Sequence, residues 1–578
     1  MRPSARSNAS NPIISINQLH LVVLSTLLLM VMSAKSQSSV PKDISIDSIF
    51  GQWQNKQAPG VVAGLIYGDS IRYTKAFGYA DVDNGKKNNA KTRFQIGYPS
   101  RQFVVLGILI LESQGKLSLG DPLRKYLPDF PQYQHRLNIS HLVNHTSGLN
   151  DLRMLRRIIG IEDNDLHTQE DDLNVIRTQK QLNFIPGTNF SYMTSKTEIT
   201  LMLEIIKKAS GQSLASFATD YIFSPLQMEN SCFSKEDNNI LENKAISYQN
   251  QGDSLKLQKL RLTHVFYTSA EDLNRWYTAL TGKAQTSLSQ IMRKLDKPVT
   301  LKNGATFDSW WGQLTLGRSF YHKERGLPAY WQFGRVGGYA SNVFRFPEQQ
   351  LTSFVLGNNN EYNGMPAMLH ANQYIENQYT EPSSIDPKLL KIRSLSAKAL
   401  KKYEGHYWDA KRGIARKLQV ERDTLFYKRL DQEEGAPLIP LKTSETFQLL
   451  VEGDEKIIFS FQEIEGKAIY DVTLGESRPY RYVRYAPSKS ENLNEYVGVF
   501  YNKDLKVIYD FEISGEQLLA RGPKGKMVNF YPVMKDIFRS DAIEFGSIRF
   551  ARDTSGKIDG FTIFTDGIQN LKFNKLKS

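Results

Sequence analysis

Two groups of residues could take part in catalysis or metal binding by their types and spacing: the segment around Ser100, and a pair of histidines. Ser100 lies just before a strongly apolar segment, residues 103–111, but the side chain one helical turn after it is a phenylalanine. A serine nucleophile needs a base within hydrogen-bonding reach, so Ser100 is a poor candidate. His141 and His145 have the spacing of a pair of metal ligands on one helix face. Because there is only one cysteine, Cys232, and no glycine-rich phosphate loop, no other metal or nucleotide motif is present.

Length and charge limit the class of protein. A chain of 578 residues is too long for one hydrophobic core, so we expect about three or four units. The net charge of +13 comes from 73 basic and 60 acidic residues, and the excess is scattered along the chain. A basic protein with no basic run interleaved with aromatics is not typical of a nucleic-acid partner.

The N-terminal segment, residues 1–36, has the features of a signal peptide. Arg2 and Arg6 precede the short apolar run of residues 21–32, and Ala34-Lys35-Ser36 offers small residues for cleavage. The run is too short to span a bilayer comfortably, so an uncleaved anchor is the weaker alternative. We expect an exported protein, periplasmic or secreted, with no stable membrane span after cleavage.

Residues 37–380 show the hydrophobic patterns of a mixed domain. The segment 103–111 is apolar on every side, which is typical of a helix in the middle of a large domain. The patterns predict helices over residues 46–53, 197–209, 270–280 and 366–378, and strands over residues 61–67, 71–77, 340–346 and 351–356. Strands at both ends with helices between them indicate an α/β or α+β domain whose antiparallel sheet pairs distant parts of the chain.

After a linker at residues 381–396, the pattern changes to short strands with frequent turns. Examples are residues 469–473, 506–513 and 560–564, a spacing that indicates closed barrels or sandwiches. The sequence L-x-x-Y-x-G-x-aromatic occurs at residues 400–407 and again at 493–500. This repeat predicts two similar β-barrel-like modules, residues 397–488 and 489–578. One hypothesis is that the interiors of these barrels hold a small apolar ligand.

Several motifs in the first domain resemble the serine β-lactamase and penicillin-binding-protein-like superfamily. They occur in the order of that family and cover roughly residues 43–375: Phe94-Gln95-Ile96-Gly97, Gly115-Lys116-Leu117-Ser118-Leu119-Gly120-Asp121-Pro122, His141-Leu142-Val143-Asn144-His145-Thr146-Ser147-Gly148-Leu149, Pro186-Gly187-Thr188, and Gly338-Tyr339-Ala340-Ser341. The resemblance implies a β-lactamase/transpeptidase-like fold with a sheet and a helical lobe. The paired modules that follow resemble the C-terminal barrels of D-aminopeptidase-type members.

The resemblance also locates the positions of the family's acylation chemistry. Members use Ser-x-x-Lys at the start of the buried helix, and the corresponding residues here are Tyr98-Pro99-Ser100-Arg101. An arginine cannot act as a base, because its pKa is above about 12. A phenol with a reference pKa of about 10 is a poor nucleophile without a base. Tyr98 and Arg101 thus predict that the acylation chemistry is lost.

The other motifs of the family also differ. Its Tyr-x-Asn motif appears as Tyr192-Met193-Thr194. The tyrosine remains, but the hydroxyl of a threonine replaces the side-chain amide of the asparagine. The motif His/Lys-x-Gly on a strand appears as Gln332-Phe333-Gly334, where only the glycine remains. His141 and His145 fall in a segment that resembles a structural loop of the family, so we expect neither a metal nor a cofactor.

The sequence therefore leads to one favoured hypothesis and one enzymatic alternative. The favoured hypothesis is a non-acylating domain that binds peptidoglycan-type peptides or a protein partner, with Arg101 and Arg335 attracting a carboxylate. On this hypothesis Thr194, Gln332, Gly334 and Arg335 bind the ligand. In the alternative, a hydrolase of small esters or amides, Arg101 lowers the pKa of Tyr98, which acts as the nucleophile with Tyr192 nearby.

Overall fold

The structure is a computed structural model of the chain. It describes residues 46–53, 57–163, 165, 167–191, 195–236, 241–251, 254–257, 263–282, 286–309, 312–359, 365–375, 393–430, 432, 434–450, 457–474, 479–487, 492–565 and 567–576. The predicted signal peptide, residues 381–392 of the predicted linker, and Tyr192 and Thr194 lie outside the described residues.

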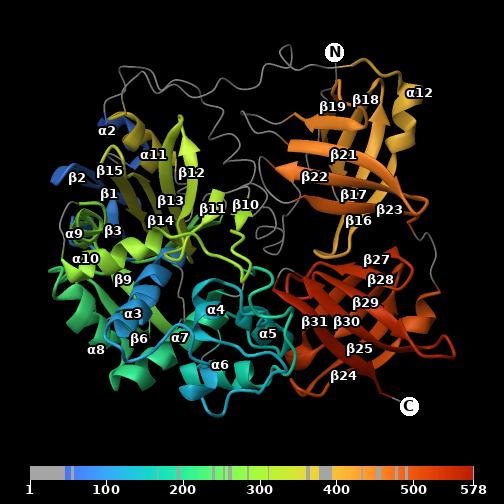
Figure 1. Cartoon of the computed structure of the whole chain (residues 1–578), viewed down its shortest axis with the longest axis horizontal. Helices are drawn as coiled ribbons and strands as arrows, with labels where there is room; N and C mark the ends of the chain where they lie inside the picture. The colour runs from blue at the N-terminus through green and yellow to red at the C-terminus, as the bar shows by residue number, and fades with distance from the viewer. Residues whose placement is uncertain are drawn as a thin grey trace, which may run out of the picture.

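An eight-stranded antiparallel sheet forms the centre of the first domain (Figure 1). Its first long strand pairs with its last one, from Val61↔Gly357 to Tyr67↔Leu351, so that distant parts of the chain meet. The strands, in spatial order, are β10 (Asp308–Ser309), β11 (Gly312–Leu314), β12 (Phe320–Glu324), β13 (Leu327–Val336), β14 (Tyr339–Phe346), β15 (Leu351–Gly357), β1 (Val61–Tyr67) and β2 (Ser70–Phe77). Smaller sheets join β3 (Tyr79–Asp81) to β4 (Lys86–Lys87), β5 (Phe94–Gln95) to β9 (Thr263–Thr268) and β6 (Cys232–Glu236), and β7 (Tyr248–Gln251) to β8 (Ser254–Leu257).

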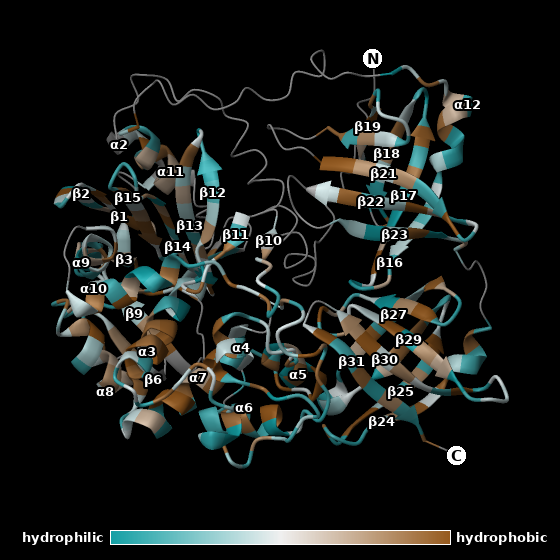
Figure 2. Ribbon diagram, in the orientation of Figure 1, coloured by the Kyte–Doolittle hydropathy of each residue, from teal (hydrophilic) through white to brown (hydrophobic). Residues whose placement is uncertain are grey.

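The helices of this domain pack around α3 (Arg101–Ser113), in which the first eleven residues are buried. Hydrophobic colour is concentrated on α3 in Figure 2. The other α-helices of the domain are α2 (Ile46–Ile49), α4 (Ile139–Val143), α5 (Leu152–Ile158), α6 (Gln169–Arg177), α7 (Ser195–Ser210), α8 (Leu214–Ala218), α9 (Ala270–Thr281), α10 (Ser287–Met292) and α11 (Met365–Asn372). Within the described part of the chain, no helix has the length and apolarity needed to cross a membrane.

The predicted fold class is confirmed, with differences at some ends. The predicted strands at residues 61–67 and 351–356 coincide with β1 and β15 to within one residue. The predicted helix at residues 46–53 is instead α2 followed by the short 3₁₀ helix η1 (Gly51–Trp53). The predicted helix at residues 366–378 is shorter, because α11 ends at Asn372.

The C-terminal region forms two closed eight-stranded barrels, which lie beside the first domain in Figure 1. The helix α12 (Ala397–Leu400) leads into barrel 1, which contains β16 (Gly405–Asp409), β17 (Ile414–Glu421), β18 (Thr424–Arg429), β19 (Gly435–Pro440), β20 (Thr446–Leu449), β21 (Ile457–Ile464), β22 (Lys467–Leu474) and β23 (Tyr480–Tyr485). Barrel 2 contains β24 (Gly498–Asn502), β25 (Val507–Ser514), β26 (Gln517–Arg521), β27 (Met527–Met534), β28 (Ile537–Ser540), β29 (Ser547–Arg552), β30 (Ile558–Thr565) and β31 (Ile568–Lys575).

The repeated motif places a tyrosine at the start of each barrel. It forms a single turn of 3₁₀ helix, whose tyrosine, Tyr403 or Tyr496, is buried in the barrel core. The hydroxyl of each donates to a carboxylate, 2.8 Å from Tyr403 to Glu445 and 2.9 Å from Tyr496 to Asp536. The motif glycine that follows has a φ of 143° in barrel 1 and 131° in barrel 2, a conformation that favours glycine. The repeated motif therefore has a structural role, because it places a buried, hydrogen-bonded tyrosine in the core of each barrel.

Aromatic rings fill the interior of barrel 2. Phe561 and Phe573 stack with their ring centroids 4.6 Å apart, and Phe500, Phe511 and Phe550 surround them as fully or almost fully buried neighbours. An eight-stranded barrel is just wide enough for side chains to fill it. This packing corrects the hypothesis of a small apolar ligand inside this barrel, because the core side chains take up that space.

Barrel 2 is docked tightly against the first domain. Its buried residues belong to the same hydrophobic core cluster as α3 and α7. The hydroxyl of Tyr509 donates to the carbonyl of Ile158 at the end of α5, at 2.8 Å. The side chain of Asn183 donates to the carbonyl of Gly567 and accepts from the backbone of Gln569. Barrel 2 and the helical lobe therefore form one packed unit.

We expect that Tyr509→Phe lowers the free energy of unfolding of the full chain by about 1–3 kcal/mol, because it leaves the buried carbonyl of Ile158 without its donor. The measurement is the denaturation midpoint in urea. The control is Tyr501→Phe on the neighbouring strand, where the side chain is only half-buried. Equal midpoints for Tyr509→Phe and the wild type would contradict the docking role of this hydroxyl.

Candidate functional site

The segment that precedes α3 lies directly against β13. Gly97 has a φ of 62°, and a Cβ at this position would lie 2.9 Å from the backbone nitrogen of Arg335. After it, Tyr98–Ser100 form the 3₁₀ helix η2, with Pro99 in its first turn, where a missing N–H costs nothing. The glycine and the proline thus direct the chain into α3 while Tyr98 stays at the surface.

Tyr98 is an exposed tyrosine covered on one face by an arginine. The residue is 46% exposed, and the guanidinium carbon of Arg318 lies 4.4 Å from the centroid of its ring. Arg318 sits at a φ of 61° in the turn between β11 and β12. This cation–π contact places positive charge beside the position that corresponds to the nucleophile of the family.

Arg101, the first residue of α3, is completely buried and paired. Its Nη1 lies 3.3 Å from Oε2 of Glu198 on α7, and its Nη2 donates to the carbonyl of Leu142 on α4 at 2.6 Å. Burial lowers the pKa of Arg101 to about 10, against the opposing effect of Glu198. The guanidinium therefore stays protonated at neutral pH and cannot accept a proton from Tyr98. Its charge is neutralised by Glu198, which corrects the expectation that Arg101 offers positive charge to a ligand.

Glu198 is the centre of this buried cluster. Its Oε2 lies 2.7 Å from Nδ1 of His145, and its Oε1 accepts a hydrogen bond from Ser147 at 3.0 Å. The pKa of His145 is well below its usual value because of burial and the positive charges of Arg101 and Arg318. A neutral His145 can donate its Nδ1–H to the carboxylate. One carboxylate therefore holds the start of α3 and the loop after α4.

The predicted ligand-binding residues of β13 face the interior. A Cβ on Gly334 would lie 1.8 Å from the carbonyl oxygen of Ile96, so the glycine makes room for the chain's own backbone. Gln332 is buried, donates to the carbonyl of Gly317 at 3.0 Å and accepts from the hydroxyl of Tyr277 at 3.1 Å. Both residues hold the sheet against neighbouring segments, and their role toward a ligand stays a prediction.

The remaining predicted residues divide into two groups. Arg335 is half-buried next to η2, with its guanidinium 5.6 Å from the ring of Phe333, and burial lowers its pKa. Its backbone lies against Gly97, one residue before Tyr98. Tyr192 and Thr194 lie outside the described residues, so their contacts with this cluster stay predictions.

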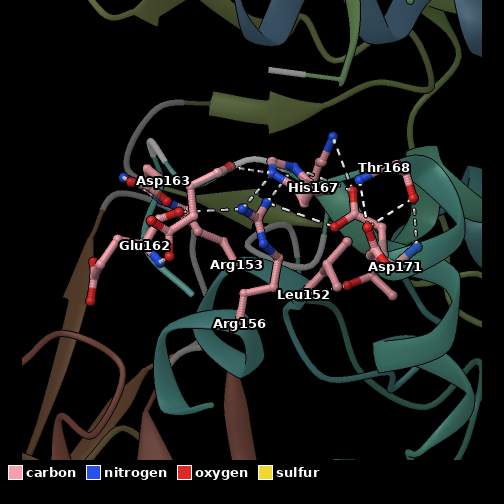
Figure 3. A network of polar contacts seen from close by, with 12 residues as sticks. Leu152, Arg153, Arg156, Glu162, Asp163, His167, Thr168 and Asp171 are labelled. Carbon is pink, nitrogen blue, oxygen red and sulfur yellow. Dashed lines mark hydrogen bonds and ion pairs between the residues drawn. The ribbon is translucent and has the colours of Figure 1, made fainter. Parts of the chain in front are cut away.

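An ionic network lies around α5 and the loop that follows it (Figure 3). Asp163 binds Nη2 of Arg153 and Nη2 of Arg157, each at 2.6 Å, and Arg156 contacts the ring of His167. Because these two arginines stabilise the negative charge of Asp163, the pKa of its carboxyl group is lowered.

The other side of the same loop reaches barrel 2. Lys524 lies 3.0 Å from Asp165, and Lys526 lies 3.1 Å from Glu162. Ion pairs thus join barrel 2 to the loop between α5 and α6, and that loop to the arginines of α5.

The two histidines with metal-ligand spacing have separate partners. Nδ1 of His141 accepts from the backbone of Asn138 at the start of α4, whereas His145 contacts Glu198. No group of three or more possible ligands that would hold a metal ion occurs among the described residues.

Sequence reasoning missed Glu198 and Arg318. Glu198 carried a signal, because it shares a helix face with Leu201 and Ile205, and an acid on an apolar face needs a buried partner. Arg318 carried none, since an arginine in a turn is typical of an exposed surface. The pairing itself depends on how α3, α4 and α7 meet, which local patterns do not specify.

Residues 46–375, more than half of the chain, match the Beta-lactamase family. The chain belongs to the beta-lactamase family. Its departures from the family's motifs therefore occur within a shared fold, at the start of α3 and on β13.

Several relatives support this assignment. Protein flp of Staphylococcus aureus (strain MW2) is 26% identical over 349 residues, which are 57% of this chain and 66% of that protein. Penicillin-binding protein 4* of Bacillus subtilis (strain 168) is 33% identical over 175 residues, or 30% of this chain and 38% of that protein. The match spans about two thirds of the staphylococcal protein's length.

Among solved structures, the octameric penicillin-binding protein homologue from Pyrococcus abyssi aligns with a TM-score of 0.50 at 21% identity. The alignment covers 76% of this chain and 99% of that one. At this identity, the likeness shows the fold alone.

Asp151, the N-cap residue of α5, is expected to make the stability of the folded protein depend on pH. Its carboxylate is buried and accepts from the backbone of Met154 at 2.9 Å, and burial raises its pKa to about 6. An acid whose pKa is higher in the folded than in the unfolded state stabilises the folded protein while it is protonated. This contribution is complete below the unfolded pKa of about 4, and it is lost as the pH rises through about 6.

We therefore expect Asp151→Asn, which keeps an N-cap acceptor, to be nearly neutral at pH 4 and to stabilise the protein by up to about 3 kcal/mol at pH 7. The measurement is the free energy of unfolding as a function of pH. The exposed Asp129→Asn is the control. A pH-independent difference between wild type and Asp151→Asn would show that Asp151 does not titrate in this range.

Proposed function

We propose that this protein is an exported member of the beta-lactamase family that binds peptides with a free C-terminal carboxylate, of the peptidoglycan type, without acylation. The observation that carries the proposal is the buried pair of Arg101 and Glu198. A serine acylation mechanism needs a neutral base one turn after the nucleophile. Here that position holds a permanent cation whose partner is a carboxylate.

The charges around Tyr98 support binding of an anionic group. Arg318 covers the ring of Tyr98, and the backbone of Arg335 lies against Gly97, one residue before it. Arginine forms charge-assisted hydrogen bonds with a carboxylate through two parallel donors. A peptide carboxylate near Tyr98 would meet Arg318 at the position where active members of the family place their nucleophile.

Export is part of the proposal and rests on residues 1–36. Their basic start, short apolar run and small residues have the order of a cleavable signal. A peptidoglycan-type ligand lies outside the cytoplasmic membrane, so the proposed ligand and the proposed location agree.

The first test is covalent labelling. After incubation of the purified full chain with a fluorescent penicillin, we expect no increase in intact mass. The double variant Tyr98→Ser/Arg101→Lys restores the family's serine and lysine and serves as the positive comparison. Covalent labelling of the wild type that Tyr98→Phe abolishes would contradict the proposal and favour the alternative of a hydrolase with a tyrosine nucleophile.

The second test is the recognition of the carboxylate. We expect the peptide acetyl-L-Lys-D-Ala-D-Ala to bind at least about tenfold more tightly than its C-terminal amide, because hydrogen bonds between charged groups contribute about 1.5–3 kcal/mol. Calorimetry measures both affinities. Arg318→Gln is expected to remove the preference, whereas Arg72→Gln on the exposed strand β2 is expected to keep it. Equal affinities for acid and amide in the wild type would contradict recognition of the carboxylate.

A further inference from the structure

The interiors of the two barrels differ at one position of their shared pattern. Thirteen residues after the motif tyrosine, barrel 2 has Tyr509, whose hydroxyl donates to the carbonyl of Ile158, and barrel 1 has Arg416. Side chains alternate along a strand, and Arg416 lies two residues before the core residue Leu418 on β17, so it faces the interior of the barrel. Barrel 1 therefore has a charged group where barrel 2 has a hydroxyl with a partner.

Tyrosines surround Arg416 in this part of the interior. Arg416 lies opposite Tyr407 in the ladder between β16 and β17, and its Nε donates to the hydroxyl of Tyr427 on β18 at 2.7 Å. The ring centroid of Tyr407 is 4.7 Å from that of Tyr470 on β22, and the ring of Tyr470 stacks on that of Tyr482 on β23 at 4.8 Å. We call Arg416, Tyr427, Tyr470 and Tyr482 the arginine–tyrosine layer of barrel 1.

The charge of Arg416 has no counter-ion among the residues that the structure describes. Its Nε and Nη1 donate to the hydroxyl of Tyr427 and the carbonyl of Ala415, which are neutral acceptors. The neighbouring Arg412, in contrast, pairs with the carboxylate of Asp409 at 2.6 Å. A cation inside a barrel is costly without an opposite charge. The Nη2 of Arg416 is therefore a donor that an anion could satisfy.

The tyrosine hydroxyls of the layer are donors without acceptors in the described part of the chain. Tyr470 is completely buried, and its hydroxyl makes no hydrogen bond there. The hydroxyls of Tyr427 and Tyr482 each accept from an arginine, and neither donates to a described residue. Burial raises the pKa of Tyr470 and of Tyr482, so both phenols keep their protons at neutral pH. The layer thus has an excess of donors, which suits an anion.

Solvent reaches the layer from within the barrel. Arg416 and Tyr427 face the interior, yet both are only half-buried. Tyr403, in the turn before β16, packs on Phe461, whereas Phe459, two residues earlier on β21, packs on Tyr427. The layer therefore lies further along the barrel than the tyrosine of the repeated motif. An inward-facing side chain of a closed barrel meets solvent only through an end, so a small molecule could enter there.

The chemistry of the layer favours a small organic acid. One uncompensated arginine matches the single negative charge of a carboxylate better than the higher charge of a phosphate group. The tyrosine rings offer apolar faces to the rest of the molecule. An eight-stranded barrel has room for at most one small ligand beside its own side chains. These polar groups distinguish the site from one for a wholly apolar ligand.

We propose that the arginine–tyrosine layer binds the carboxylate of a small organic acid, of about the size of benzoate, inside barrel 1. The Nη2 of Arg416 donates to the carboxylate, and the hydroxyl of Tyr470 supplies a second hydrogen bond. The site lies in barrel 1 and does not depend on the function proposed for the first domain.

The test uses 4-fluorobenzoate and the full chain, with binding followed by the line width of the fluorine NMR signal. We expect saturable binding, and at least about tenfold weaker binding of 4-fluorobenzamide, because the amide has the same shape but no charge. Arg416→Gln is expected to weaken the binding of 4-fluorobenzoate at least about tenfold, and Tyr470→Phe, which keeps the charge, at least about threefold.

The matched control is Arg422→Gln, which makes the same change in charge in the exposed turn between β17 and β18. Its affinity for 4-fluorobenzoate is expected to stay within about twofold of that of the wild type, because a charge in solvent contributes little at this distance. Far-UV circular dichroism shows whether each variant is folded. If Arg416→Gln does not fold, Tyr470→Phe decides the outcome.

Four results would overturn the proposal. They are an absence of saturable binding, equal affinities for the acid and the amide, wild-type affinity in Tyr470→Phe, and displacement of 4-fluorobenzoate by an equal concentration of inorganic phosphate, which would indicate a general anion site. Arg318→Gln is expected to keep the affinity of the wild type. A loss of binding in that variant would place the acid near Tyr98 and would also contradict a site in barrel 1.

Discussion

The buried ion pair between Arg101 and Glu198 is the interaction on which the organisation of the helical lobe depends. Two charges without solvent are costly to bury, and removal of either one leaves the other uncompensated. The guanidinium also donates to carbonyls of α4, and the carboxylate also binds His145 and Ser147. Three helices and one loop therefore meet at this pair. In this chain the first residue of α3 packs these segments together.

The same pair is the basis of the proposal that this chain keeps the fold of the beta-lactamase family without its acylation chemistry. A lysine base must be neutral for part of the time, which requires a site that does not stabilise its charge. Glu198 does the opposite, because it favours the charged form of its partner. The guanidinium of Arg318 over the ring of Tyr98 adds positive charge at this point, and the proposed binding of an anion rests on it.

Much of the fold was predictable because its signals are local. The alternation and turns of β1, β2, β14 and β15, the apolar α3 and the repeated Tyr-x-Gly motif all mark elements that the structure contains. The ends of helices were less predictable, since the short η1 and the end of α11 depend on packing against the sheet. The segment before α3 lies against β13, where Gly97 meets the backbone of Arg335 and Gly334 meets the carbonyl of Ile96.

The contacts between distant segments were not predictable in the same way. The partner of Arg101 lies on α7, and its choice depends on the crossing of three helices. The inward orientation of Gln332 follows from the register of β13, and a shift by one residue would reverse it. The docking of barrel 2 on α5 rests on complementary surfaces. None of these features has a pattern within one stretch of sequence.

The most direct measurement is a double-mutant cycle on the central pair, with Arg101→Met, Glu198→Leu and the combined variant compared by their free energies of unfolding. Each single variant is expected to lose about 3 kcal/mol or more, and the combined variant to lose at least about 2 kcal/mol less than the sum of the two. Additive losses would mean that the two side chains do not interact in the folded protein, and would contradict the account.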